Sequence, residues 1–386
     1  MLIGIVGAPN KGKTTLFSAL TLRYAEISPR PFTTISPNKG VAYVKVECVE
    51  KELGVKCNPK NSICINGNRL IPVNVIDVAG LVPGAHLGKG MGNQFLNDLA
   101  SADALIQVVD ATCKTDPFGN PCEYYDAIEE VKFVKEEIEE WLFGILKRNI
   151  KKLKDFDEFL QVLSFMKAKR EVVEKAIENA KLNFSTTWDD EELKDFVKSF
   201  IALNKPIVVA LNKIDLEEAR KNLQRLKSEA EKLGVKAIPT SAEIELALRR
   251  ANEKGIVSYV PGENKFEIKE ANDKQLEALK LIEKILKEIK TTGVIELLNE
   301  VVFGVLKAIV VYPVEDENKF TDHFGNVLPD AILMPNGSKV IELAEKIHSE
   351  LAQNFLYAID AKTKKRIGKD EVLKNNDVIK IVAKRK

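Results

Sequence analysis

The chain has 386 residues, which allows about two to four domains and a substantial core. Charged residues make up 30% of the sequence but nearly cancel at a formal net charge of +1, which excludes a global field of the kind that attracts nucleic acid or membranes. No run of about 18 apolar residues occurs, so we expect no membrane span and no membrane partner. The apolar start, residues 1–8, lacks a basic leader and is too short for a secretory signal, and we interpret it as a buried strand.

The five cysteines predict a reducing, cytoplasmic location. Their number is odd and they contain no C-x-x-C pair, which disfavours a disulfide framework in a chain of this size. A zinc site built from Cys48, Cys57 and Cys64 is the alternative. Their uneven spacing and the lack of a nearby histidine argue against it.

The first expected elements are a strand, a glycine-rich turn and a helix. "LIGIVG" suits a buried strand, "KTTLFSAL" suits a helix, and residues 7–14 between them fit the phosphate-binding loop G-x-x-x-x-G-K-[ST]. Backbone N–H groups of such a loop bind the α- and β-phosphates, Lys13 is expected to bridge the β- and γ-phosphates, and the Thr14 hydroxyl to ligate Mg²⁺. The predicted nucleotide-binding residues here are Gly7, Ala8, Pro9, Asn10, Lys11, Gly12, Lys13, Thr14 and Thr15.

Two segments further along are expected to sense the γ-phosphate. "RPFTTISPNKG" (residues 30–40) lies between the helix that follows the glycine-rich loop and the strand that ends in Asp77. Its Thr34 is the candidate that reaches Mg²⁺ and the γ-phosphate, with Thr33 as the alternative. Both threonines also suit an ordinary turn. The strand expected at residues 71–80 ends in D-x-x-G, where Asp77 would be a second Mg²⁺ ligand and the Gly80 amide would contact the γ-phosphate.

Three more apolar runs, at residues 104–111, 206–215 and 236–242, complete an α/β fold with a doubly wound, mainly parallel sheet. The long stretch at residues 119–200 instead repeats apolar residues every three or four positions, which predicts a helical insertion, interpreted as a hairpin. The core fold is expected to continue around it.

A base-recognition element closes the run at residues 206–215. In "NKID", the Asp215 carboxylate can accept hydrogen bonds from N1–H and the amino group of guanine, whereas adenine has no such pair of donors. Asn212 and Lys213 belong to the same element. Ser241 and Ala242, after the next strand, would supply a backbone N–H to guanine O6. These residues predict a preference for GTP over ATP, with a surface turn as the alternative interpretation.

Downstream, the sequence predicts an amphipathic helix at residues 273–293 and another in "GVIELLNEVVFGVL", after which the pattern of apolar residues changes from helical to strand-like. After residue 306, four strand-like segments surround one helix in "KVIELAEKIHSELAQ", which indicates a small α+β domain. The expected domains are therefore a nucleotide-binding domain at residues 1–118 and 201–303, the helical insertion at 119–200 and a C-terminal domain at 304–386.

These motifs resemble the Obg-like branch of translation-factor-related P-loop GTPases. "GAPNKGKTT", "PFTTISPN" and "DVAGLVPGAHLGKGMGNQFL" are similar to its YchF-related subgroup, and residues 330–382 resemble a TGS domain, a β-grasp module. The resemblance spans nearly the whole chain and implies a Ras-like G domain with an insertion. YchF proper replaces the aspartate of the base-recognition motif with glutamate and prefers ATP. This chain keeps Asn212, Lys213 and Asp215, so it resembles the archaeal and eukaryotic sister group that keeps the guanine code.

The sequence places Leu81 where many related switches have the glutamine that orients the attacking water, and the resemblance implies a hydrophobic residue there. Leucine can neither donate nor accept a hydrogen bond, so water must be positioned by the backbone, a monovalent cation or a partner. Asn10 occupies the position that helps to bind K⁺ in related GTPases. His86 is a candidate general base, although an exposed loop histidine is the simpler interpretation.

The leading functional hypothesis is a GTP-hydrolysing switch, with Mg²⁺ as cofactor, that alternates between GTP and GDP and binds ribosomes or RNA through the TGS domain. Basic residues of that domain could face phosphates or form a solvated turn: Lys362, Lys364, Lys365, Arg366 and Lys369. The alternatives are a nucleotide-sensing binding protein with incidental hydrolysis and a YchF-type ATPase. The sequence gives neither the oligomeric state nor the step in translation.

Overall fold

The computed structural model describes residues 1–22, 38–78 and 98–384. The chain forms two compact units, one of Met1–Ala42 with Asn74–Leu297 and the other of Tyr43–Val73 with Leu298–Lys386. This division differs from the expected domain bounds, because residues 43–73 group with the C-terminal part and the helices of residues 119–200 group with the nucleotide-binding motifs. Within the described ranges, no helix is long and apolar enough to cross a membrane.

The predicted doubly wound sheet is present. Its strands are β1 Leu2–Val6, β2 Lys39–Glu47, β4 Asn68–Asp77, β5 Ala104–Asp110, β6 Ile207–Asn212 and β7 Lys236–Pro239, in the order β2-β4-β1-β5-β6-β7. Strand β3 Ile63–Ile65 pairs with β4, and β2 and β3 were not predicted. The pairs β1–β4, β1–β5, β5–β6 and β6–β7 are parallel. All seven residues of β5 are buried, as expected for a central strand that is covered on both faces. This order brings the carboxyl ends of β1, β4, β5 and β6 to one edge.

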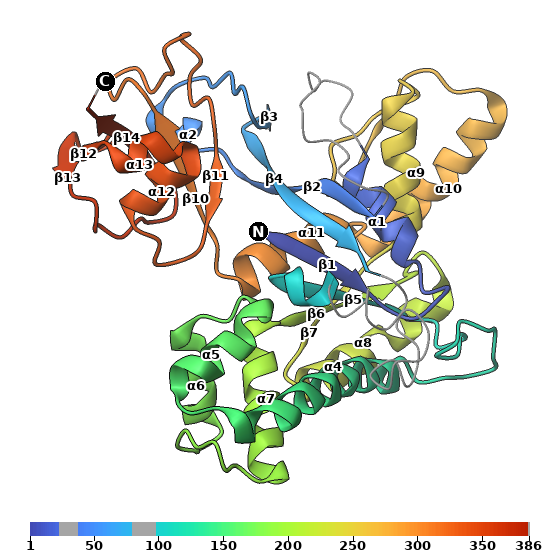
Figure 1. Cartoon of the computed structure of the whole chain (residues 1–386). Helices are drawn as coiled ribbons and strands as arrows, with labels where there is room; N and C mark the ends of the chain where they lie inside the picture. The colour runs from blue at the N-terminus through green and yellow to red at the C-terminus, as the bar shows by residue number, and fades with distance from the viewer. Residues whose placement is uncertain (23–37, 79–97, 385–386) are drawn as a thin grey trace. The chain divides into compact units, whose positions relative to one another are not determined.

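Helices α1 Lys13–Thr21, α8 Glu217–Lys232, α9 Ala242–Glu253 and α10 Asp273–Ile289 belong to the same unit (Figure 1). Helix α10 confirms the amphipathic helix predicted there. A two-stranded sheet of β8 Val257–Ser258 and β9 Glu267–Ile268 lies between α9 and α10 in the chain. The last predicted helix of this region forms as α11 Val294–Asn299 followed by a π-helix, Glu300–Val305.

The insertion is helical, but the prediction of a hairpin was wrong. Residues 119–200, which the structure describes throughout, contain α4 Ala127–Asn149, α5 Phe156–Leu163, α6 Arg170–Asn179 and most of α7 Asp190–Asn204, with 3₁₀ turns at Ile150–Lys152 and Ser164–Met166 (Figure 1). The breaks have local causes. Asp155 and Asp189 cap the starts of α5 and α7 by accepting backbone N–H bonds, and Lys167 adopts a left-handed conformation with φ 54° after α5. Buried aromatic residues then pack these short helices together.

The C-terminal part of the second unit forms a five-stranded sheet in the order β11-β10-β14-β12-β13. The strands are β10 Ile309–Val314, β11 Ile332–Met334, β12 Phe355–Asp360, β13 Lys365–Ile367 and β14 Asp377–Ala383. The single helix predicted here is two helices, α12 Val340–Ile347 and α13 Ser349–Gln353, because His348 between them is extended (φ −164°, ψ 134°). Strand β13 was not predicted, since its basic residues were interpreted as a turn or patch.

Residues 43–73 complete the second unit. They contain the end of β2, the short helix α2 Glu50–Leu53 and strand β3 Ile63–Ile65, which pairs antiparallel with β4. Main-chain bonds tie this segment to the C-terminal part of the unit: the Asn58 N–H donates to the Val327 carbonyl (3.1 Å) and the Lys60 N–H to the Pro329 carbonyl (2.8 Å).

Candidate functional site

The glycine-rich loop lies between β1 and α1, as predicted, and two glycines are required by close packing. Gly12 has φ 93°, and a Cβ there would lie 2.2 Å from Nδ2 of Asn212. Gly7 has φ 149°, and a Cβ would lie 2.6 Å from the Val108 carbonyl oxygen. A side chain at either position would be disfavoured by the positive φ and would also clash with the neighbouring atom. The loop delivers the N-terminus of α1, where unpaired N–H groups favour an anion.

Three side chains converge at the start of α1. The Lys13 Nζ lies 2.9 Å from Asp77 Oδ1 and 2.8 Å from the Val78 carbonyl oxygen, and the Thr14 hydroxyl donates to Asp77 Oδ2 at 3.3 Å. A hydroxyl and a carboxylate are ligands that Mg²⁺ prefers, and neighbouring ligands of an octahedral Mg²⁺ lie about 2.9 Å apart, given metal–oxygen distances of about 2.0–2.1 Å. Thr14 and Asp77 therefore fit the ion. Lys13 brings positive charge to the same place.

Asn212 joins two loops. Its Nδ2 donates to the Lys11 carbonyl (3.0 Å) and its Oδ1 accepts from the Ala242 N–H (3.1 Å), and the side chain is buried. The Asp215 carboxylate accepts a hydrogen bond from the Ser241 hydroxyl at 2.6 Å. The structure thus brings four of the predicted base-recognition residues together and links them to the glycine-rich loop: Asn212, Asp215, Ser241 and Ala242. The sequence predicted a role for Asn212 in base recognition, but not its hydrogen bond to the Lys11 carbonyl.

Lys213 contacts the end of β5. It has φ 72°, and its Nζ lies 2.8 Å from Asp110 Oδ2. Burial raises the pKa of Asp110, but hydrogen bonds from Lys213 and Thr112 outweigh that effect and the pKa lies below its ordinary value. Asp110 was not singled out from the sequence, because a single acidic residue at the end of a buried strand has no motif of its own.

Lys11 contributes its backbone to the loop, whereas its side chain is enclosed by the protein. The side chain is 1% exposed, and its Nζ lies 2.9 Å from Glu130 Oε2 and donates to the carbonyl and hydroxyl of Thr115 (2.9 and 3.0 Å). Burial raises the pKa of Glu130 despite the nearby ammonium. No short-range sequence signal identifies Glu130 or Thr115, which are more than 100 positions from Lys11.

Asn10 is held by the loop that leads into the insertion. It has φ 61°, and its Nδ2 donates to the Gly119 carbonyl at 3.0 Å. Gly119 in turn must be glycine for contact reasons, because a Cβ there would lie 2.7 Å from the Pro9 carbonyl oxygen. The predicted residues Thr33, Thr34, Gly80, Leu81 and His86 lie outside the described residues.

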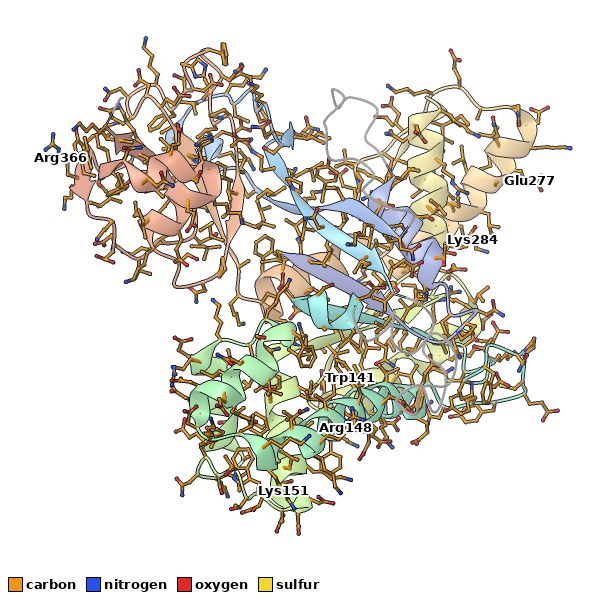
Figure 2. All side chains as sticks on the ribbon, in the orientation of Figure 1. Trp141, Arg148, Lys151, Glu277, Lys284 and Arg366 are labelled. Carbon is orange, nitrogen blue, oxygen red and sulfur yellow. The ribbon has the colours of Figure 1, made fainter. Side chains whose placement is uncertain are left out.

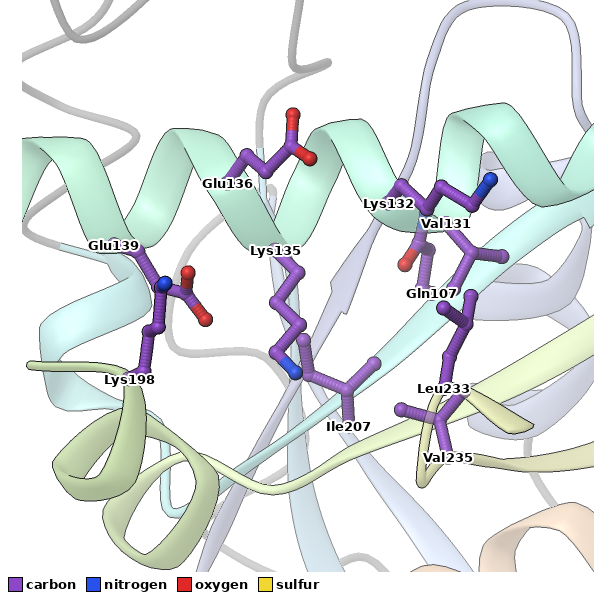
Figure 3. A pocket seen from close by; sticks show the side chains of 10 residues that line it. All are labelled: Gln107, Val131, Lys132, Lys135, Glu136, Glu139, Lys198, Ile207, Leu233 and Val235. Carbon is purple, nitrogen blue, oxygen red and sulfur yellow. The ribbon is translucent and has the colours of Figure 1, made fainter. Parts of the chain in front are cut away.

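A separate pocket of about 290 Å³ lies in the same unit between α4, α7 and the sheet (Figure 3). Its ten lining residues include none of the motif residues above: Gln107, Val131, Lys132, Lys135, Glu136, Glu139, Lys198, Ile207, Leu233 and Val235. Burial raises the pKa of Glu139 in this pocket. The nucleotide motifs and the pocket are therefore distinct features.

The basic residues of the C-terminal domain are partly engaged within their own unit. Lys362 Nζ lies 2.8 Å from both carboxylate oxygens of Glu52, and Lys364 donates to the Glu317 carbonyl. Arg366, labelled in Figure 2, is exposed on β13 and lies over the Tyr357 ring at 4.0 Å. The predicted patch thus contains paired and exposed members.

Comparison with known families agrees with this organisation. Residues 2–151 match the family described as 50S ribosome-binding GTPase, residues 210–316 match the G4 motif-containing domain of Obg-like YGR210-like GTPases, and residues 324–383 match the TGS domain.

Individual relatives extend over the whole chain. An uncharacterized GTP-binding protein of Methanocaldococcus jannaschii is 51% identical over 99% of both chains, and one of Schizosaccharomyces pombe is 33% identical over 90% of both. The crystal structure of a GTP-binding protein from Pyrococcus horikoshii, 40% identical, covers 99% of this chain and 100% of its own with a TM-score of 0.78. This chain therefore belongs to the Obg-like, YchF-type family of P-loop GTP-binding proteins with a C-terminal TGS domain.

Proposed function

We propose that the protein hydrolyses GTP to GDP and phosphate and that the bound nucleotide controls its association with ribosomes. The observation that carries the proposal is the convergence of Lys13, Thr14 and Asp77 at the N-terminus of α1. Lys13 would neutralise the β- and γ-phosphates, while Thr14 and Asp77 would hold Mg²⁺. The ion supplies charge neutralisation to the transferred phosphoryl group.

Asp215 supports GTP over ATP. The Ser241 hydroxyl holds one carboxylate oxygen at 2.6 Å and so restricts the orientation of the group that would accept from guanine. Some relatives are named ATPases: a Buchnera aphidicola protein named ribosome-binding ATPase YchF is 28% identical over 92% of this chain and 86% of its own. An ATPase is therefore the second candidate, which the retained aspartate disfavours.

Competition between nucleotides tests the choice. With a fluorescent GDP bound in Mg²⁺ buffer, GTP is expected to displace it at least about tenfold more efficiently than ATP, a difference of about 1.4 kcal/mol. Equal displacement would contradict the guanine assignment.

A K13A variant is expected to lose triphosphate affinity, because no other described side chain brings positive charge to that point. Unchanged GTP hydrolysis by K13A would contradict the assignment of the site.

We further propose that the group orienting the attacking water comes from a K⁺ ion near Asn10 or from a partner, since the side chain of Leu81 has no polar atom. Intrinsic turnover is expected to be slow and to rise in K⁺ relative to Na⁺ or on addition of the partner. GTP turnover of tens per second without K⁺ and without a partner would contradict this explanation. Such a rate is reached by GTPases that are assembled with their activating protein, at about 5–20 s⁻¹.

The ribosome part of the proposal rests on the matched family description and on the name of the Buchnera relative. Its test is co-sedimentation with ribosomal subunits at a stated salt concentration, comparing GDP with a non-hydrolysable GTP analogue. Nucleotide-dependent binding is expected. Absence of binding in both states would leave nucleotide hydrolysis standing and contradict the ribosomal role.

A further inference from the structure

Three cysteines and a glutamate meet in the second unit, although they are spread along a stretch with little regular structure. Cys48 follows β2, Glu50 begins α2, Cys57 lies in the loop after α2, and Cys64 is the central residue of β3. One ligand atom from each residue lies within 4.8 Å of all the others. All four belong to the segment Tyr43–Val73 of the second unit, and none of them is one of the predicted nucleotide-binding residues.

The distances between these atoms fit a tetrahedral metal ion. With Zn–S bonds of about 2.3 Å, two sulfur ligands of a tetrahedron lie about 3.8 Å apart, and a sulfur and an oxygen ligand about 3.5–3.7 Å apart. The Sγ atoms of Cys48 and Cys57 are 3.9 Å apart, and Cys64 Sγ lies 3.5 Å from Glu50 Oε1. Three thiols and a carboxylate are a ligand set that zinc accepts, with no position left open.

The surrounding backbone fixes the ligands. The Cys48 N–H donates to the Gly67 carbonyl at 2.8 Å, which joins the end of β2 to the turn between β3 and β4. The Cys57 N–H donates to Glu50 Oε2 at 2.8 Å, which leaves Oε1 as the carboxylate oxygen directed at Cys64. Such outer contacts orient metal ligands and restrict their rotation.

A buried cation beside the cluster provides independent support. Arg69 pairs in register with Cys64 and is 0% exposed. Its Nη atoms donate to the Ser62 hydroxyl and the Leu328 carbonyl, but its Nε has no hydrogen-bond partner, and it forms no ion pair with a carboxylate within the described ranges. Its guanidinium also lies 5.5 Å from the centre of the Tyr312 ring, but a buried charge without an opposite charge beside it is still costly. Zinc with three thiolates and a carboxylate carries a net double negative charge, which would compensate it.

We propose that Cys48, Cys57, Cys64 and Glu50 bind a structural Zn²⁺ ion. A closed, four-ligand site has no coordination position for a substrate, so the ion would act as a cross-link. It would fix residues 48–67, whose own hydrophobic content is small, and so hold the main-chain donors of Asn58 and Lys60 against the C-terminal part of the unit. The competing arrangement is a disulfide between Cys48 and Cys57.

The test is the metal content of the untagged full-length protein after removal of loosely bound ions. Elemental analysis is expected to find one zinc per chain. Replacement of zinc by Co²⁺ should give the thiolate-to-cobalt charge-transfer absorption of a tetrahedral site. Less than about one fifth of a zinc per chain after reconstitution with excess Zn²⁺ would overturn the proposal. A count of the free thiols in denaturant and chelator gives a second check. If only three of the five cysteines react, two of them form a disulfide, and the proposal is again overturned.

Variants locate the ion. C57S and C64S are expected to lose zinc, whereas C122S, a matched replacement of a half-buried cysteine outside the cluster, should retain it. Because the cysteine variants could fail to fold, E50Q provides a second test that keeps all three thiols. It should weaken zinc affinity at least about tenfold, measured by competition with a chelator. Unchanged affinity in E50Q would remove Glu50 from the site, and zinc retained in C57S and C64S would contradict the assignment.

Discussion

At the scale of single residues, the glycine-rich loop depends on contacts that its own motif does not reveal. The pattern identifies Gly12, but its packing partner Asn212 is 200 positions away and is apparent only in the fold. The same holds for Lys11, whose side chain pairs with Glu130 rather than facing the loop's anion-binding side. The motif therefore predicts the backbone at these positions and not the side-chain partners.

A G12A variant is expected to lower nucleotide affinity at least about tenfold, or about 1.4 kcal/mol. Its Cβ would lie 2.2 Å from Asn212 Nδ2, so the loop or the asparagine must shift. G234A is the matched control, because Gly234 also has a positive φ (73°) but a Cβ there meets nothing within 4 Å. It should cost only the left-handed strain of about 1–2 kcal/mol in stability. Equal nucleotide titrations for both variants would contradict the role of the clash.

Lys205 gives a prediction for pH. It is 1% exposed and donates to the Ala100 and Ala102 carbonyls, and burial lowers its pKa to about 8. The unfolded chain, with an ordinary lysine pKa near 10.4, then binds more protons than the folded chain between about pH 8 and 10.4. Stability should therefore rise with pH across that window, by up to about 3 kcal/mol for this group.

The measurement is denaturant unfolding of the wild type and of K205M at several pH values. Other groups that titrate in both proteins cancel in the difference, so the wild type should gain stability relative to K205M as the pH rises from about 8 to 10.4. A constant difference would mean that Lys205 keeps an ordinary pKa when buried.

At the scale of elements, the insertion shows what periodicity can and cannot predict. Apolar spacing correctly indicated helices at residues 119–200, but the capped breaks at Asp155 and Asp189 produced more helices than a hairpin has. A similar break at His348 divides α12 from α13. Spacing reports which face is apolar, whereas caps and single extended residues decide where a helix ends. Parallel strands were predicted well because their apolar runs are long and continuous.

Phe159 is expected to be a main determinant of insertion stability. It is fully buried, and its ring lies near those of Phe184, Trp188 and Phe196. F159A should cost about 3–5 kcal/mol in the free energy of unfolding. The control F165A removes a 39% exposed ring with one edge contact to Trp141, and should cost less than about 1.5 kcal/mol. Equal losses in chemical denaturation would contradict the assignment of the core.

At the scale of the whole molecule, the sequence predicted the family, the sheet and the C-terminal domain, but not the membership of residues 43–73 in the second unit. That membership depends on contacts such as Asn58 with Val327 and Lys362 with Glu52, which join segments more than 250 positions apart. Strand patterns carry no information about such partners. The sequence analysis weighed a site of the three cysteines but disfavoured it on their spacing, and it did not identify Glu50 as a fourth member.

A chain that ends at residue 297 is expected to expose residues 48–67 to protease. Its main-chain donors lose the Val327 and Pro329 carbonyls, and buried Arg69 loses the Leu328 carbonyl. Limited proteolysis with mass spectrometry should find early cleavage there in the shortened chain and late cleavage in the full chain. Equal protection would show that the segment holds its structure without residues 298–386.

The bracing by Asn212 has a thermodynamic consequence. One amide side chain holds the Lys11 carbonyl through its nitrogen and the Ala242 N–H through its oxygen. If ordering of either loop favours ordering of the other, the base and the phosphate moieties of a nucleotide bind with a coupling free energy, and each must raise the affinity of the other by the same factor. Guanosine and tripolyphosphate would then be positively cooperative ligands. The binding free energy of intact GTP would include this coupling free energy, which neither fragment shows when it binds alone.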